Sequence, residues 1–295
     1  MTFIASYRQD KAHTNEEVYK MPKKLNRLLI TGASGALGSH CRKHVKDLAN
    51  TIRVTDKAEI SDNPGSNSKM PEEVIRCDLS DYEAVLKLVD GCDGILHFGG
   101  QATEADWETV RTSNIEGIYN LYEAARIKGC KRIFFASSIH AIGFHPLTKK
   151  IDDKASIRPD TLYGASKAFG EAIARMYFEK FGIETACVRI ASCQPAPQNH
   201  RMLATWFSYN DLVSLVKSVF EAPVLGCPII YGVSNNDRKW ANNNAVSFLG
   251  WSPNDNANDY KDQITQAMDE PEPTSDDFNF IGGPFVSFEI MNEIE

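Results

Sequence analysis

Short apolar runs alternate along the chain with segments in which apolar residues recur every three or four positions. The first pattern predicts buried strands and the second predicts amphipathic helices. The strand-like runs lie at residues 27–31, 52–55, 74–77, 94–98, 132–136, 184–189 and 228–232. The helix-like segments lie at about 38–48, 80–89, 107–128, 163–181 and 208–220. This alternation predicts an α/β fold with a doubly wound parallel sheet.

A glycine-rich turn follows the first predicted strand. Gly32, Gly35 and Gly38 precede a helix and then a second strand that ends at Asp56. Such glycines allow a tight turn and let a helix N-terminus approach a pyrophosphate, and the acid can accept hydrogen bonds from the adenosine ribose. The context predicts a Rossmann-type NAD site rather than an ordinary tight turn. Asp56 disfavours the ribose phosphate of NADP, although Lys57 weakens that preference.

Tyr163 and Lys167 lie four positions apart on a predicted helix and therefore share a face. A free tyrosine has a pKa of about 10, and a nearby ammonium group favours the phenolate and lowers that pKa. Ser138, which follows the strand at 132–136, can hold the oxygen that loses its proton. The three residues predict a general-base site for an alcohol. The alternative for the pair is a surface or packing role.

Polar and glycine residues follow the ends of several predicted strands. They are Gly32, Asp56, Gly99, Ser138 and Ser192. In doubly wound sheets, ligands bind beyond the carboxyl ends of the strands. We therefore expect these residues to converge on one site.

The periodic pattern divides the chain into three parts. Residues 1–24 are polar and mixed in charge and predict an N-terminal extension, and residues 25–190 predict the NAD-binding Rossmann core. Residues 191–295 are broken by prolines and predict a small substrate-binding lobe and a C-terminal segment packed on the core. The last 27 residues carry eight acids. The stretch at 280–285 is too apolar for a free tail, so we expect it to dock.

Composition excludes several classes of protein. The chain has 295 residues, 42% of them hydrophobic and 24% charged, which is typical of a globular protein. A net charge of −7 without a basic stripe argues against nucleic acid as a partner. We expect no membrane span, since no apolar run reaches 18 residues. The seven scattered cysteines show no metal spacing, and reduced thiols predict a cytoplasmic protein. Whether it forms a homo-oligomer is left open.

The glycine turn, Ser138 and the Tyr163–Lys167 pair together resemble the extended short-chain dehydrogenase/reductase superfamily. Local strings after residue 24 are similar to those of bacterial uronate dehydrogenases. They lie at 119–126, 135–138, 158–160, 162–164, 166–171, 201–206 and 280–285. The resemblance implies an NAD-dependent oxidation of a hexuronic acid, such as galacturonate or glucuronate, at its anomeric carbon. The implied product is an aldaro-lactone.

The resemblance also implies roles for individual residues. Tyr163 is the base, Ser138 bonds the reacting oxygen, and Lys167 holds the nicotinamide ribose and lowers the pKa of Tyr163. The residues implied to line the dinucleotide are Gly32, Gly35, Gly38, Asp56, Asp78 and Leu79, together with Tyr163 and Lys167. Those implied to contact the sugar acid are Ser138, His140, Ser192, Arg201 and Phe285. A planar guanidinium suits a carboxylate.

Each of these substrate contacts has a plainer alternative. Arg201 can be an ordinary surface residue, His140 a satisfied core histidine and Phe285 a packing residue. Asn114 can orient the backbone of the site or cap its helix.

Two positions depart from the family pattern. Ile139 stands where the family has asparagine, and Ala102 where it has serine. Two lost hydrogen bonds, at roughly 0.5–1.5 kcal/mol each, can redirect recognition of sugar hydroxyls. The alternatives are therefore a dehydrogenase for a different sugar, a nucleotide-sugar epimerase or dehydratase, and a non-catalytic NAD-binding module.

Overall fold

The computed structural model describes residues 24–61, 71–272 and 274–290. Except for Lys24, the predicted N-terminal extension lies outside the described residues. The main sheet contains β1 (Leu25–Thr31), β2 (Ala49–Thr55), β3 (Glu72–Val74), β4 (Gly94–His97), β5 (Arg132–Ser138), β6 (Glu184–Ile190) and β9 (Ile229–Gly232). These seven strands are parallel, in the order β3-β2-β1-β4-β5-β6-β9. The predicted doubly wound parallel sheet is confirmed.

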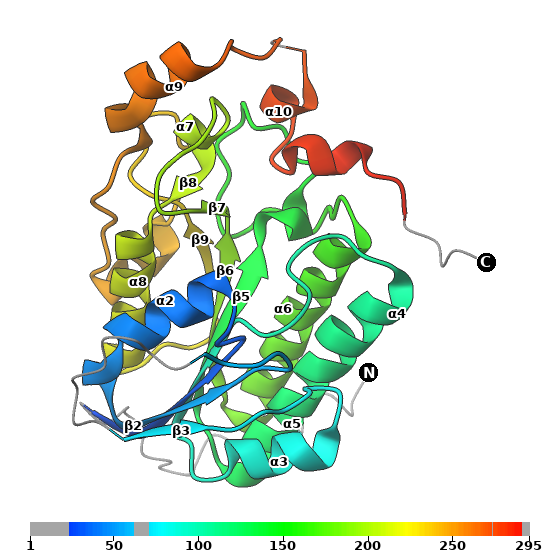
Figure 1. Ribbon diagram of the computed structural model, residues 1–295, viewed down its shortest axis with the longest axis vertical. Coiled ribbons are helices and arrows are strands. Elements are labelled where there is room, and N and C mark those ends of the chain that lie inside the picture. The colour runs from blue at the N-terminus through cyan, green and yellow to red at the C-terminus, as the bar shows by residue number, and fades with distance from the viewer. Residues whose placement is uncertain (1–23, 62–70, 273, 291–295) are drawn as a thin grey trace, which may run out of the picture.

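Helices cover both faces of the sheet (Figure 1). The α-helices of the described residues are α2 (Ala36–His44), α3 (Tyr82–Val89), α4 (Trp107–Val110), α5 (Gly117–Lys128), α6 (Leu162–Phe181), α7 (Met202–Thr205), α8 (Tyr209–Glu221), α9 (Lys261–Ala267) and α10 (Asp276–Asn279). One apolar cluster joins the sheet to α2 and α8, including Cys41 and Leu215. A second joins the opposite face to α3, α5 and α6, including Val85, Leu121 and Tyr177. Within the described ranges, no helix has both the length and the apolar character needed to cross a bilayer.

Several element boundaries differ from the sequence-based expectation. The first helix ends at His44, and Lys46–Leu48 form a separate 3-10 turn. The strand expected at 74–77 is β3, which ends at Val74. The helix expected from about residue 80 begins at Tyr82, because Asp81 is the N-cap of α3 and accepts a hydrogen bond from the amide of Ala84.

The long helix expected at 107–128 is interrupted. The segment Arg111–Glu116 between α4 and α5 is a π-helix. A π-helical turn is frequently found at a functional site, and Asn114 lies within it.

The C-terminal part of the chain contributes to the sheet and to its edge. Strand β9 comes from the segment expected to form the lobe, so the sheet draws on residues beyond 190. A short two-stranded sheet, β7 (Ser192–Cys193) and β8 (Trp206–Phe207), extends from the carboxyl end of β6. The segment at 280–285 docks as expected, since Ile281 is fully buried and its amide donates to the carbonyl of His145.

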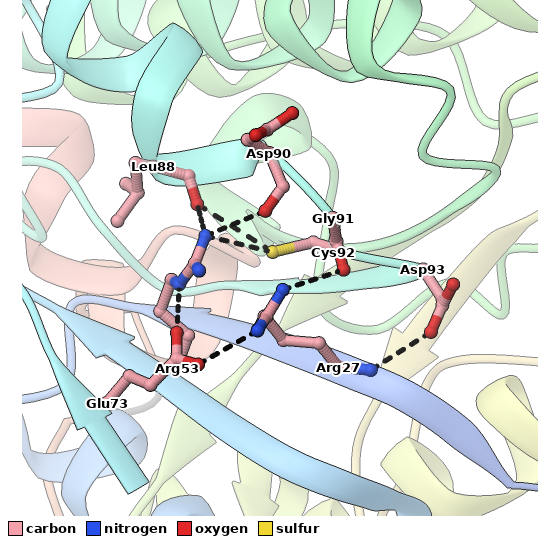
Figure 2. A network of polar contacts seen from close by, with 8 residues as sticks. All are labelled: Arg27, Arg53, Glu73, Leu88, Asp90, Gly91, Cys92 and Asp93. Carbon is pink, nitrogen blue, oxygen red and sulfur yellow. Dashed lines mark hydrogen bonds and ion pairs between the residues drawn. The ribbon is translucent and has the colours of Figure 1, made fainter.

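Two arginines tie edge strand β3 to the neighbouring strands and to α3 (Figure 2). Arg53 Nε donates to Glu73 at 2.7 Å, and its Nη1 donates to the carbonyls of Leu88 and Asp90 at the end of α3. Arg27 donates to the same Glu73 carboxylate from β1 at 2.9 Å. These bonds hold the short strand in register with β2 and satisfy carbonyls that the helix leaves unpaired.

A buried ion pair holds α6 against the sheet. Glu171 on α6 forms two hydrogen bonds with the guanidinium of Arg189 on β6, at 2.9 and 2.8 Å. Ser137 on β5 donates to the same carboxylate at 2.6 Å. Both charged residues are buried. The pair therefore fixes the position of α6 relative to two strands.

Replacing Glu171 by alanine leaves the guanidinium of Arg189 buried without its charged partner. We expect Glu171→Ala to lower the free energy of unfolding by about 3–5 kcal/mol, measured by urea denaturation. The matched control is Glu179→Ala on the same helix, where an exposed pair with Arg175 at 3.5 Å contributes less than about 1 kcal/mol. Equal stability of the two variants would contradict the assignment.

Candidate active site

A cleft of about 680 Å³ opens along the carboxyl edge of the sheet. The predicted site residues that line it are Gly32, Gly35, Gly38, Asp56, Ser138, His140, Tyr163, Lys167, Ser192, Arg201 and Phe285. A second cavity of about 190 Å³ shares Gly32 and Asp56 with the first and is lined by Asp78 and Leu79. The structure thus brings every predicted site residue to this cleft or to the cavity that adjoins it.

The glycine turn at the end of β1 is too tight for side chains. Gly32 has a φ of +69°, and a Cβ atom there would lie 2.7 Å from the backbone nitrogen of Gly99. A Cβ atom on Gly38 would lie 2.1 Å from the carbonyl oxygen of Gly32. Helix α2 has no side-chain cap at Gly35 and no acid in its first turn. Its amides can therefore receive a pyrophosphate.

Carboxylates lie at the far end of the cleft. Asp56 accepts hydrogen bonds from the amide and the hydroxyl of Ser34, at 3.0 and 2.6 Å. Lys57 pairs with Asp78 at 3.0 Å. Hydrogen bonds from Ser80 and Lys57 lower the pKa of Asp78, so this carboxylate is ionised at neutral pH. Two acceptors beside a small cavity fit the hydroxyls of a ribose.

Tyr163, Lys167 and Ser138 meet in the middle of the cleft, and all three are buried. Lys167 Nζ donates to the carbonyl of Ala136 at 3.0 Å and lies 5.5 Å from the ring centroid of Tyr163. Burial raises the pKa of Tyr163 to about 12, opposed by a hydrogen bond with Ser138. Burial also lowers the pKa of Lys167 to about 8.

These shifts differ from the expectation that Lys167 lowers the pKa of Tyr163. The ammonium group lies beside the ring of Tyr163 and is itself desolvated, so burial dominates both groups. The protein alone therefore holds Tyr163 as the neutral phenol at pH 7.

Two residues around Tyr163 support the site. Glu104 is buried, and its carboxylate accepts the amides of Leu162 and Tyr163 at 3.2 and 2.8 Å, at the start of α6. Sequence reasoning missed Glu104, because nothing in its local pattern shows that it reaches a distant helix. Asn114 bonds the amide and carbonyl of Gln101, so it orients the backbone of the cleft.

The end of the cleft where the sugar acid is expected, called the substrate end below, is lined by residues after β6, by the C-terminal segment and by residues that follow β4 and β5. Ser192 Oγ lies 2.9 Å from the hydroxyl of Thr205. Arg201 lines the cleft and also donates to the carbonyls of Phe280 and Ile281. It therefore anchors the C-terminal segment, a role that the sequence did not indicate. Ala102 and Ile139 line the same cleft with apolar side chains.

His140 and Phe285 lie together at this end. Their rings stack with centroids 4.1 Å apart. His140 Nδ1 lies 2.8 Å from the carboxylate of Asp160. His140 therefore lines the cleft and also has a hydrogen-bond partner, so it is not simply a core histidine.

The glycine turn and the buried group of Tyr163, Lys167 and Ser138 line one cleft. This arrangement is typical of a dinucleotide-dependent enzyme. Residues 28–206 match the model of the NAD dependent epimerase/dehydratase family, and the chain belongs to that family. It is 49% identical to a uronate dehydrogenase of Agrobacterium fabrum over 91% of this chain and 100% of that protein. A uronate dehydrogenase of Pseudomonas putida is 44% identical over 88% of this chain and 95% of its own length.

A solved structure gives the same similarity. A mutant of the Agrobacterium tumefaciens uronate dehydrogenase complexed with NAD has a TM-score of 0.87 and 48% identity, covering 91% of this chain and 99% of that one.

The buried charge of Lys167 predicts a pH dependence of stability. Its pKa of about 8 in the folded state lies below the ordinary value of 10.5. Below pH 8 the ammonium group is charged in both states, and its burial lowers the free energy of unfolding. Between pH 8 and 10.5 only the unfolded state keeps the proton, so this loss of stability becomes smaller as the pH rises. We expect Lys167→Met to be more stable than the parent at pH 7 and this advantage to fall to less than half by pH 9.5, measured by urea denaturation.

The control is Lys180→Met, an exposed lysine on the same helix. Its stability should differ little from the parent at every pH. A Lys167→Met advantage that stays constant from pH 7 to 9.5 would refute the lowered pKa.

Proposed function

We propose that this chain is an NAD-dependent uronate dehydrogenase that oxidises a hexuronic acid at its anomeric carbon to an aldaro-lactone. The observation that carries the proposal is the meeting of Tyr163, Lys167 and Ser138 in the cleft that begins at the glycine turn. Uronate dehydrogenases that align along most of the chain support the choice of substrate.

The chain's residues suit each part of NAD. The amides of α2 bind the pyrophosphate, Asp56 and Asp78 accept ribose hydroxyls, and Lys167 binds the nicotinamide ribose. When bound, NAD accepts the hydride from the anomeric carbon and supplies a positive charge near Tyr163. That charge favours the phenolate, which the protein alone does not stabilise.

Tyr163 acts as the general base. Its phenolate takes the proton of the anomeric hydroxyl, and the Ser138 hydroxyl stabilises the oxygen as its charge changes. Residues after β6, together with His140, line the substrate end of the cleft. There Arg201 binds the sugar carboxylate while it anchors the C-terminal segment, Ser192 and His140 bond sugar hydroxyls, and Phe285 covers the pocket.

The second candidate is a nucleotide-sugar epimerase or dehydratase, because the family model includes such enzymes. Such an enzyme needs space for a nucleotide diphosphate. The docked segment that contains Phe285 lines the substrate end, and the relatives that align along most of this chain are uronate dehydrogenases, which favours the first candidate.

The free thiols are buried except for that of Cys193, which is partly exposed, and they support a cytoplasmic location.

Replacing Tyr163 by phenylalanine removes the base and keeps the ring. We expect Tyr163→Phe to bind NAD normally and to turn over at least ~100-fold more slowly, because general-base catalysis contributes about that factor or more. NADH absorbance measures the rate and fluorescence titration measures coenzyme binding. Turnover near that of the parent would rule out Tyr163 as the base.

A substrate panel tests the substrate class. We expect NADH formation with galacturonate or glucuronate and at least ~10-fold lower kcat/KM with the neutral parent aldoses, since a charge-assisted bond to Arg201 contributes about 1.5–3 kcal/mol. Nucleotide sugars should give no net NADH. Faster oxidation of neutral aldoses would overturn the role of Arg201, and epimerisation without net NADH would favour the second candidate.

A further inference from the structure

A fully buried carboxylate lies behind the substrate end of the cleft. The side chain of Asp160 has no exposed surface, whereas that of His140 is 14% exposed. Asp160 Oδ2 lies 2.8 Å from His140 Nδ1, and Oδ1 accepts the hydroxyl of Thr161 at 2.9 Å. Both carboxylate oxygens therefore have a defined partner, and one of these partners is a histidine that lines the cleft.

The backbone closes around this carboxylate at two glycines that are far apart in sequence. A Cβ atom at either Gly143 or Gly282 would lie 1.9 Å from Asp160 Oδ2. The two glycines are themselves joined, since the amide of Gly282 donates to the carbonyl of Gly143 at 2.9 Å. The C-terminal segment thus completes the pocket that holds Asp160.

The ring of His140 is fixed on both sides. It stacks on Phe285 at an interplanar angle of 28°, and it meets the ring of Tyr163 edge-on at 5.7 Å between centroids. Nδ1 is held by Asp160, and Nε2 has no hydrogen-bond partner among the described residues. The opposite edge of the imidazole, which carries Nε2, is therefore the one available to a ligand in the cleft.

The hydrogen bond to Asp160 decides which nitrogen carries the proton. An ionised carboxylate only accepts hydrogen bonds, so Nδ1 must be the donor. In a neutral imidazole the other nitrogen, Nε2, is then an acceptor. An acceptor at this position binds a hydroxyl of the substrate, which can donate a hydrogen bond. It does not bind the carboxylate or the ring oxygen, which only accept.

We propose that Asp160 is a positioning residue that holds His140 in the Nδ1–H tautomer, so that Nε2 accepts a hydrogen bond from a ring hydroxyl of the sugar acid. The hydrogen bond with the sugar acid rests on the proposed function, whereas the assignment of the tautomer does not. Ile139 and Ala102 offer no polar side chain in the same cleft. Recognition of the sugar hydroxyls therefore depends more on His140 here than where asparagine and serine stand at these two positions.

The tautomer can be measured directly on the full chain. Multiple-bond ¹H–¹⁵N correlation spectra of the ¹⁵N-histidine-labelled protein distinguish the two neutral forms, and His140→Asn identifies the resonance. We expect His140 as the Nδ1–H form at pH 7.5 without substrate. The Nε2–H form would overturn the proposal. This result is independent of whether any uronate is oxidised.

Asp160→Asn tests the origin of the tautomer. Asparagine can present either its oxygen or its amide to Nδ1, so we expect the Nε2–H form of His140 to appear in the spectrum. We also expect kcat/KM for the uronate to fall about 5- to 10-fold, mainly through KM, because the lost bond forms in substrate and transition state alike. NAD binding, measured by fluorescence titration, should not change.

The control is Asp152→Asn, which removes the same charge from an exposed residue of the preceding loop. Its spectrum and KM should match those of the parent. If Asp160→Asn keeps a pure Nδ1–H form and a KM within 2-fold of the parent, Asp160 does not set the tautomer. If the parent oxidises no uronate while His140 is the Nδ1–H form, the proposed function fails and the tautomer assignment stands.

Discussion

The close packing of α6 on β5 is the constraint on which the site depends. Gly170 makes this approach possible, because a Cβ atom there would lie 2.4 Å from the ring of Phe135. The helix is then held by the Glu171–Arg189 pair and by the bond from Lys167 to the carbonyl of Ala136. Since Ser138 ends the same strand, any shift of α6 moves Tyr163 relative to it.

This packing has an electrostatic consequence. Burial raises the pKa of Tyr163 and lowers that of Lys167, so both shifts favour the uncharged forms. The proposed base is the phenolate of Tyr163, and burial in the ligand-free protein disfavours that form. In the proposed function, ionisation of Tyr163 therefore depends on the positive charge of the bound coenzyme.

The C-terminal segment completes the cleft through contacts that span most of the chain. Arg201 binds the carbonyls of Phe280 and Ile281, Gly282 packs on Asp160, and Phe285 stacks on His140. One short segment therefore contacts Arg201, Asp160 and His140 together. In the proposed function, binding of the sugar acid and docking of this segment depend on the same residues.

The amino-acid pattern predicted the strands of the main sheet apart from the bounds of β3, the glycine turn and the Tyr163–Lys167 pair, because these rest on local periodicity and on spacing within one helix. It also indicated the common edge where they meet, since parallel strands place their carboxyl ends together. Only the tertiary structure showed Glu104 at the start of α6, Arg201 on the C-terminal segment and Asp160 on His140. Each of these bonds joins residues that are distant in sequence or separated by irregular chain, and no local pattern encodes such a contact. The pKa shifts of Tyr163 and Lys167 likewise follow from the fold, because desolvation depends on everything that packs around a group and not on its neighbours in the chain.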